Sequence, residues 1–181
     1  MLESIQNFDN ALLDFIQTNM RIGFLDIVMP YITSLGNGGF VWIVIGLVLV
    51  CLKKYRMIGF AVLFALVLCL LIGNLGLKPL IARLRPSDIY PDIALLIPRP
   101  HDYSFPSGHT MSSFAVATVL FLSFKRIGIF ALLLAALIAF SRLYLYVHYP
   151  TDILGGIVIG VGIGAAVTFS FKSVEKKKLL A

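Results

Sequence analysis

The segment MIGFAVLFALVLCLLIGNLGL, residues 57–77, contains no charged side chain. A run of this length matches the ~20 residues that an α-helix needs to cross the hydrocarbon core of a bilayer. The whole chain has the same character, because 59% of its 181 residues are hydrophobic and only 13% are charged. Its mean hydropathy is +0.95. These values are not those of a soluble domain, and they predict a polytopic membrane protein.

Other apolar segments repeat this character and are separated by short polar stretches. We expect the crossings to lie at residues 40–52, 57–77, 107–124, 127–147 and 152–171. The fold class that follows is all-α, a polytopic integral membrane bundle of about five transmembrane helices. We expect a single domain over residues 1–181, with the transmembrane bundle at 37–171 and a basic cytoplasmic tail at 172–181.

The first 36 residues differ from these spans because charges interrupt their apolar character. Residues 3–20 alternate apolar and acidic positions at helical spacing, which predicts an amphipathic helix. The apolar positions are Ile5, Phe8, Leu12, Phe15 and Ile16, and the acidic ones are Glu3, Asp9 and Asp14. Residues 22–36 are too short to cross and contain Asp26 and Pro30, so we expect an interfacial or partly buried helix there. Residues 1–36 are thus predicted to form interfacial helices.

The charges between the spans are distributed unevenly over the two sides of the membrane. One side combines a single carboxylate, Glu175, with nine basic residues: Lys53, Lys54, Arg56, Lys125, Arg126, Lys172, Lys176, Lys177 and Lys178. The positive-inside rule places this side in the cytoplasm. The polar connection at 87–104 and the N-terminal helices then lie on the extracytoplasmic face. The net charge of +6 indicates topology, and no nucleic-acid partner is expected.

Unusual polar residues gather near the outer ends of the spans. They are Lys78, Arg83, Arg85, Ser107, His109, Arg142, His148 and Asp152. Charges at membrane depth are costly and generally face a partner or a cavity, so the group predicts a functional site. Arg83 alone is interpreted as a basic anchor that reaches the membrane surface.

The stretch Phe105–Thr110, FPSGHT, stands where a polar segment gives way to an apolar one. A helix that starts here presents free backbone N–H groups and the positive end of its dipole, which suits an anion. Several cations and no metal-ligand spacing indicate a phosphate site. One histidine can attack phosphorus while a carboxylate holds its far nitrogen, and a second can move the proton of the leaving group. His148 and Asp152 are four residues apart, which suits such a pair in a helix.

Three spaced blocks carry a family resemblance. They are Lys78 with Arg85-Pro86, then Pro106-Ser107-Gly108-His109, then Ser141-Arg142 with His148 and Asp152. In this order and spacing they resemble the signature of the type 2 phosphatidic acid phosphatase superfamily. The resemblance implies that His148 is the nucleophile that forms a phosphohistidine, that Asp152 is its partner, and that His109 is the general acid and then the base. It also implies that the phosphate is held by Lys78, Arg85, Ser107, Gly108 and Arg142, with no metal or other cofactor.

The resemblance further implies a metal-independent lipid phosphatase in a bacterial plasma membrane, with its active site on the extracytoplasmic face. The compact form resembles small members that convert undecaprenyl diphosphate to undecaprenyl phosphate. Phosphatidylglycerol phosphate, phosphatidate and diacylglycerol diphosphate stay open as substrates, and phosphoryl transfer to a lipid acceptor stays open as a reaction. A non-catalytic transporter or scaffold is disfavoured, because both histidines and the aspartate are present. The expected partners are the lipid phosphate substrate and membrane lipids, with no obligatory protein partner.

A few residues outside these blocks also carry expectations. Gly156, Gly160 and Gly164 recur every four residues and predict a close contact with another helix. Ser141 is expected to pack or to bond within its helix, and His101 to be exposed. Cys51 and Cys69 lie in apolar runs and are expected to pack, not to form a disulfide or a zinc site.

Overall fold

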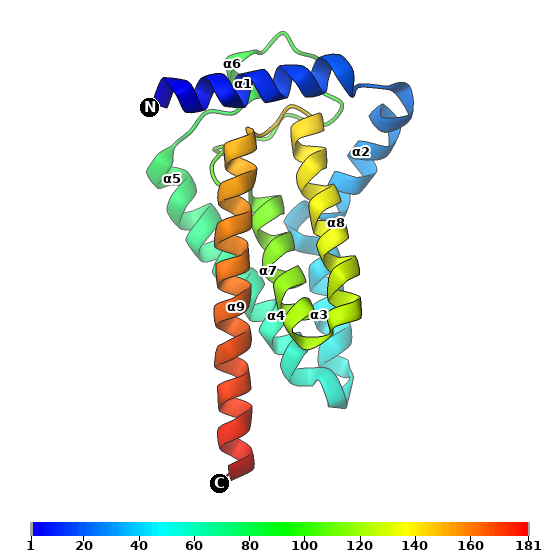
Figure 1. The fold of residues 1–181 in the computed structure, drawn as a ribbon, viewed down its shortest axis with the longest axis vertical. Coiled ribbons are helices and arrows are strands. Elements are labelled where there is room, and N and C mark those ends of the chain that lie inside the picture. The colour runs from blue at the N-terminus through cyan, green and yellow to red at the C-terminus, as the bar shows by residue number, and fades with distance from the viewer. Residues whose placement is uncertain (1, 181) are drawn as a thin grey trace.

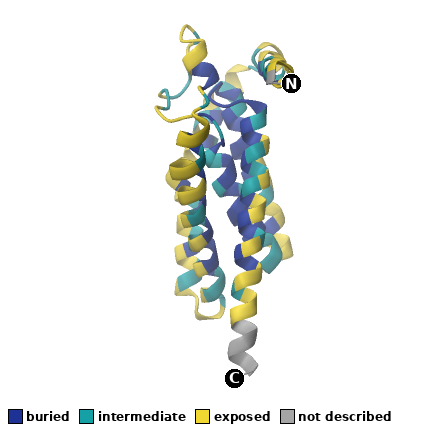
Figure 2. Ribbon diagram, turned by 90° about the vertical axis from the view of Figure 1, so that its left-hand side faces the viewer, coloured by how far each residue is buried: buried dark blue, intermediate teal, exposed yellow. Residues whose placement is uncertain are grey.

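The computed structural model describes the backbone of residues 2–180 and the side chains of residues 3–174, and this part of the chain contains helices but no strands. Helix α7 (Gly108–Ser123) lies at the centre of a bundle with α4 (Arg56–Cys69), α8 (Lys125–Tyr144) and α9 (Pro150–Leu180) (Figure 1). The middle of α7 is fully enclosed, because Ala115, Val116 and Val119 have no exposed surface. Figure 2 shows the same buried column running through the bundle. The predicted all-α membrane bundle is confirmed.

The close contact between α7 and α9 depends on the predicted glycine stripe. A Cβ atom on Gly160 would lie 2.4 Å from the backbone oxygen of Met111, and one on Gly164 would lie 2.3 Å from that of Ala115. Only a hydrogen atom fits between these two backbones, as in other small-residue helix contacts. The packing interpretation of the stripe is therefore confirmed.

The number of crossings depends on how the bent and short helices are counted. Within the described residues, three stretches are long and apolar enough to cross a membrane: Lys53–Ile89, Lys125–Tyr144 and Pro150–Val174. A fourth span forms if α2 (Gly23–Leu35) and α3 (Phe40–Cys51) are taken together. Helix α7, with 16 residues, is apolar but shorter. The prediction of five crossings therefore stays a prediction, although the predicted segments are helical.

Helices α2 and α3 form one bent unit. They meet at a 46° bend, across the short 3₁₀ turn η1 (Asn37–Gly39). Gly38 and Gly39 have φ values of +57° and +73°, a region that glycine enters without strain, so they allow the chain to change direction. Helix α2 packs against α8 and buries Met29 and Thr33. It matches the expected partly buried helix.

Helix α1 (Leu2–Asn19) lies across one end of the bundle, over the ends of α8 and α9 (Figure 1). The predicted amphipathic helix is present, but its buried side coincides only in part with the apolar stripe in the sequence, of which Ile16 is buried and Leu12 packs against the bundle. Leu13, Ile16 and the acidic Asp9 are buried against the bundle. Phe8 and Phe15 remain 54% and 55% exposed. Two sides of α1 are therefore apolar, one toward the bundle and one away from it.

The span that begins with α4 changes its helical geometry before it reaches the site. Residues Leu70–Leu77 form a π-helix, η3, which leads into the short helix α5 (Lys78–Ile81). A π-helix has i→i+5 hydrogen bonds, so it turns the following residues relative to a continuous α-helix, and such segments are frequent at functional sites. The connection from α5 to α7 contains one short helix, α6 (Pro86–Ile89), and the rest of this described stretch is not helical.

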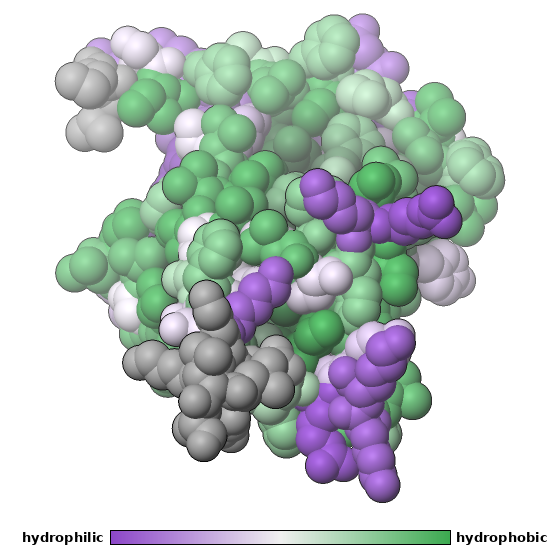
Figure 3. All heavy atoms as spheres, turned by 60° about the horizontal axis from the view of Figure 1, so that its bottom comes forward, coloured by the Kyte–Doolittle hydropathy of each residue, from purple (hydrophilic) through white to green (hydrophobic). Residues whose placement is uncertain are grey.

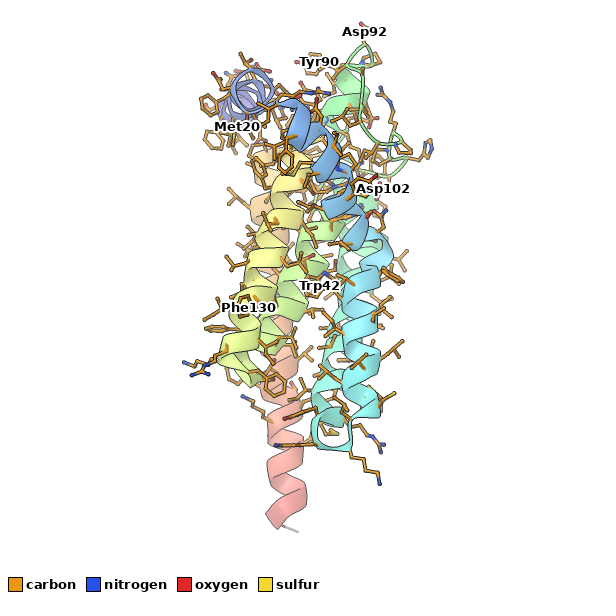
Figure 4. All side chains as sticks on the ribbon, turned by 90° about the vertical axis from the view of Figure 1, so that its right-hand side faces the viewer. Met20, Trp42, Tyr90, Asp92, Asp102 and Phe130 are labelled. Atoms are coloured by element: carbon orange, nitrogen blue, oxygen red, sulfur yellow. The ribbon has the colours of Figure 1, made fainter. Side chains whose placement is uncertain are left out.

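The bundle also contains one buried polar contact in its middle. The indole N–H of Trp42 on α3 donates to Ser113 Oγ on α7 at 2.9 Å, and both side chains are fully buried. Figure 4 places Trp42 inside the bundle, whereas Phe130 on α8 points outward. The hydrogen bond fixes the approach of α3 to the central helix.

Basic residues collect at the end of the bundle opposite α1. The turn between α3 and α4 includes the 3₁₀ segment η2 (Lys53–Tyr55), and Lys125 and Arg126 begin α8. Figure 3 views this end and shows hydrophilic side chains there among apolar ones. Helix α9 continues to Leu180, so the predicted basic tail begins as helix, and the side chains of Lys176, Lys177 and Lys178 lie outside the described residues.

Candidate active site

A cavity of about 890 Å³ opens near the end of the bundle that carries α1. It lies between the α2–α3 turn, the end of α4 with η3, the connection at 97–102 and the start of α7. The predicted residues that line it are Lys78, Arg85, Gly108, His109, Arg142 and His148. All three sequence blocks therefore meet at one place. Another part of the lining is apolar, with Ile43, Leu66 and Val67 among its residues.

His148 lies in the turn between α8 and α9 and is 99% buried, with a relative exposure of 1%. Its Nδ1 atom is 3.4 Å from Asp152 Oδ2. The sequence suggested that both residues share a helix, but α9 begins only at Pro150. Asp152 in its first turn reaches back instead and also accepts the Tyr149 backbone N–H at 2.8 Å. Ser104, which the sequence did not single out, donates to the same Asp152 oxygen and lies 3.4 Å from His148 Nδ1.

The second ring nitrogen of His148 contacts a cation. Arg85 Nη1 lies 3.0 Å from His148 Nε2 and also donates to the Val147 carbonyl at 2.6 Å. A guanidinium can only donate hydrogen bonds, so Nε2 must accept and the ring proton must lie on Nδ1, toward Asp152. This tautomer leaves a lone pair on Nε2, on the side of the cavity that holds the cations. Burial, with the charges of Arg85, Arg142 and Lys78, lowers the pKa of His148 well below its ordinary value.

Asp102 is a carboxylate of the polar connection that the sequence interpretation overlooked. It forms ion pairs with Lys78 and, at 2.7 Å, with Arg85 Nη2. Its backbone oxygen also accepts from Arg85 Nε at 2.7 Å. Its partial burial acts to raise the pKa of the carboxyl, but the hydrogen bond from Lys78 and the charge of Arg85 outweigh this and lower the pKa. Figure 4 shows Asp102 at the mouth end of the bundle, and 53% of its side chain is exposed.

Arg142 supplies a further buried cation. It belongs to the last turn of α8, is 3% exposed and donates through Nη1 to Thr33 Oγ1 at 2.7 Å. Its Nε atom is buried without a hydrogen-bond partner among the described residues. A buried donor without a partner is costly, so this atom is available to an anion in the cavity.

The start of α7 lines another part of the cavity. Ser107 is the N-cap of α7, and its hydroxyl oxygen accepts from Thr110 Oγ1 at 3.0 Å. Gly108 is the first residue of the helix. His109 Nε2 lies 2.9 Å from Asn37 Oδ1, which comes from the α2–α3 turn. A Cβ on Gly36 would lie 2.7 Å from the His109 ring, so glycine there makes room for the imidazole.

Arg83 is not the membrane-surface anchor that the sequence suggested. Its guanidinium forms ion pairs with Asp152 at 2.7 Å and with Asp9 of α1 at 2.6 Å. The anchor interpretation fails because a charge near the outer end of a span can reach a buried partner as well as water. No spacing relates residue 83 to residues 9 and 152, so the sequence contains no signal for this cluster.

The expectations for Ser141 and His101 are met. Ser141 Oγ donates to the Ile138 carbonyl within α8 at 2.6 Å, and His101 is exposed. Cys69 is buried in the core as expected, whereas the expectation that Cys51 packs is wrong, because its side chain is exposed. Within the described part of the chain, no three His, Cys, Asp or Glu side chains lie close enough together to hold a metal ion.

Comparison with known proteins identifies relatives of this chain. A family model described as the PAP2 superfamily matches residues 58–175. An undecaprenyl-diphosphatase of Sulfolobus acidocaldarius is 33% identical over 141 residues, which is 77% of this chain and 68% of the relative. A lipid A 4'-phosphatase of Bacteroides thetaiotaomicron is 31% identical over 178 residues, with 88% and 75% covered. The crystal structure of a transmembrane PAP2-type phosphatidylglycerolphosphate phosphatase from Bacillus subtilis superposes with a TM-score of 0.75 at 30% identity, over 96% of this chain and 87% of that one.

Proposed function

The chain belongs to the PAP2 superfamily of lipid phosphatases, and from this premise we propose that it hydrolyses a lipid diphosphate, undecaprenyl diphosphate above all, through a phosphohistidine on His148. One observation carries the proposal. The carboxylate of Asp102 is held by Lys78 and Arg85, and Arg85 also touches His148 Nε2. An anion is therefore bound beside the lone pair of a neutral imidazole. A phosphate that takes the place of this carboxylate is presented to the nucleophile.

The proposed first step breaks the bond between phosphorus and the leaving oxygen. Arg85 first gives up its hydrogen bond to His148 Nε2, and the freed lone pair attacks the terminal phosphorus while Lys78, Arg85 and Arg142 hold its other oxygens. Asp152 keeps the ring proton on Nδ1 and stabilises the positive charge that the ring gains. His109, held by Asn37, gives a proton to the departing lipid phosphate.

The proposed second step returns the enzyme to its starting state. His109, now without that proton, takes one from a water molecule, and the water oxygen attacks the phosphorus on His148. The phosphorus–nitrogen bond breaks, and inorganic phosphate leaves with Nε2 free again. Apart from the water molecule, the side chains named here supply every group that the two steps use.

The charge of the cavity favours a diphosphate over a monoester. Arg99 lines the cavity in addition to Lys78, Arg85 and Arg142, whereas Asp102 is the one lining carboxylate among the described residues. A diphosphate carries more negative charge than a phosphate monoester and has a second phosphate to place. We assign that phosphate to Arg99, which is 35% exposed and 3.8 Å from Asp88, a weak pair that a ligand can replace.

The proposed location is a plasma membrane with the site on the extracytoplasmic face. The basic residues of the α3–α4 turn and of the start of α8 lie at the end of the bundle opposite the cavity. The positive-inside rule puts that end in the cytoplasm. The apolar part of the cavity, near Ile43 and Leu66, suits the lipid portion of such a substrate.

The test is phosphate release from detergent micelles that contain undecaprenyl diphosphate, phosphatidylglycerol phosphate or phosphatidate. We expect the highest kcat/KM for undecaprenyl diphosphate, unchanged activity with EDTA, and no turnover by His148→Ala or His109→Ala. A higher kcat/KM for a phosphate monoester would refute the proposed substrate class. Full activity of His148→Ala, or a loss with EDTA that magnesium reverses, would refute the mechanism. A radiolabelled phosphate found on a second lipid, and not in solution, would identify a phosphotransferase.

A further inference from the structure

Arg83 connects three parts of the chain that are far apart in sequence. Its Nη1 atom donates to Asp152 Oδ1 at 2.7 Å and to Thr151 Oγ1 at 2.8 Å. Its Nη2 atom donates to Asp9 Oδ2 at 2.6 Å and to Gln6 Oε1 at 3.0 Å. The guanidinium also stacks over the ring of Tyr149, with Cζ 4.1 Å from the ring centre. Each side of the guanidinium fork is thus used by a different element.

These contacts fix the carboxylate of Asp152 from the side opposite His148. One oxygen, Oδ2, faces His148 Nδ1 and accepts from Ser104 and from the backbone N–H of Tyr149. The other oxygen, Oδ1, is held by Arg83. If Arg83 is removed, Asp152 Oδ1 loses its ion pair inside the protein, and the carboxylate can rotate away from the imidazole. The orientation of His148 therefore depends on a residue that does not line the cavity.

Asp9 of α1 holds both Arg83 and the residue before Asp152. The side chain is fully buried, and its Oδ1 accepts from the Thr151 backbone N–H at 2.9 Å. Its Oδ2 accepts from Arg83 and from the Thr151 hydroxyl. Asp9 therefore binds both the guanidinium and the first turn of α9, immediately before Asp152. A buried carboxylate is tolerated only when it is paired in this way.

We propose that Arg83 is a positioning residue for the Asp152–His148 pair, and that Asp9 makes the N-terminal helix α1 part of the catalytic framework. This inference rests on the proposed function, in which His148 attacks phosphorus. Arg83 and Asp9 touch neither the cavity nor the phosphate, and they act through Asp152. Their loss should therefore slow the chemical step and leave binding of the lipid phosphate nearly unchanged.

The test compares variants of the full chain in micelles of undecaprenyl diphosphate. We expect Arg83→Gln to lower kcat roughly ten- to a hundredfold, the range seen when the residue that orients a metal-bound histidine is removed. KM should stay within about twofold. Arg83→Lys keeps the charge but not the fork, so it should recover part of the loss. Arg56→Gln, at the opposite end of the bundle, is the matched control and should behave as the wild type.

Asp9→Asn tests the role of α1 with almost no change in volume. We expect a five- to tenfold lower kcat, whereas Asp14→Asn on the exposed side of the same helix should have no effect. The double variant Asp9→Asn/Arg83→Gln should lose less than the product of the two single losses, because both residues act on Asp152 and share the Asp9–Arg83 ion pair. If Arg83→Gln does not fold, as shown by its thermal midpoint in detergent, Asp9→Asn and Arg83→Lys carry the test.

The outcomes separate the two proposals when His148→Ala is assayed beside these variants. Inactive His148→Ala with wild-type kcat in Arg83→Gln and Asp9→Asn overturns the positioning role and leaves the proposed function intact. Active His148→Ala overturns both. A loss that appears in KM and not in kcat, or single losses that multiply in the double variant, also overturns the positioning role.

Discussion

Replacing Asp102 by asparagine removes the carboxylate that now occupies the cations of the cavity. Lys78 and Arg85 must release Asp102 before they can bind phosphate oxygens, so the carboxylate competes with the substrate. Asparagine keeps the shape and can still accept a hydrogen bond, but it carries no charge. We therefore expect Asp102→Asn to bind phosphate more tightly than the wild type does.

The size of the effect follows from the exposure of Asp102. With 53% of its side chain exposed, each ion pair is partly screened by water. Exposed pairs contribute about 0.2–1 kcal/mol each, so two pairs amount to about 0.4–2 kcal/mol. That range corresponds to a roughly two- to thirtyfold lower dissociation constant for phosphate.

Product inhibition measures this constant directly. The inhibition constant of inorganic phosphate is determined during hydrolysis of undecaprenyl diphosphate, for the wild type and for Asp102→Asn. Asp92→Asn, an exposed position on the same connection, is the control and should leave the constant unchanged. An equal or higher inhibition constant in Asp102→Asn would refute the reasoning, and it would mean that Asp102 serves to hold Arg85 in place.

Three further predictions concern the stability of the bundle, measured as thermal unfolding in detergent. Gly160→Ala places a Cβ 2.4 Å from a backbone oxygen of α7, so it should lower the free energy of unfolding by about 1–3 kcal/mol. Gly162→Ala places its Cβ in open space and should be neutral or slightly stabilising. Equal thermal midpoints for the two variants would contradict the packing of α7 on α9. Ser113→Ala leaves the buried N–H of Trp42 without its acceptor and should cost about 1–3 kcal/mol, and an unchanged midpoint would show that the bond contributes nothing. The lowered pKa of His148 means that the folded state binds fewer protons than the unfolded state below the ordinary value of 6.5, so stability should fall by up to about 1.4 kcal/mol per pH unit as the pH drops from 6.5 toward the lowered pKa. His148→Asn removes this loss, so a fall between pH 7 and pH 5.5 that is the same in wild type and variant would contradict it.

The sequence predicts the parts of this molecule that follow a local pattern. Apolar runs identify the helices of the bundle, because a span in lipid must satisfy its own backbone hydrogen bonds. The glycine stripe of α9 identifies a close helix contact for the same local reason. The three blocks bring Lys78, Arg85, His109 and His148 to one cavity because each block ends or begins a helix at the same side of the bundle.

Contacts between distant segments are what the sequence does not predict. Asp102 and Asp9 look like ordinary surface carboxylates, and only the fold places one on the phosphate cations and the other on Arg83. Asn37 belongs to a glycine-rich turn and meets His109 only because α2 and α3 bend there. Periodicity also could not tell which side of α1 is buried, because a paired carboxylate replaces an apolar residue in the buried stripe.

Because of the π-helix η3, the number of residues between Arg56 and Lys78 affects the direction of Lys78 as well as the length of the span. A π-helix bonds residue i to residue i+5 and an α-helix bonds it to residue i+4, so deleting one residue within Leu70–Leu77 changes the direction in which Lys78 points. The shortened segment can return to α-helical bonding and still cross the bilayer. A deletion here therefore leaves a protein that inserts normally and has its lysine aimed away from the phosphate, whereas the same deletion in a loop is absorbed.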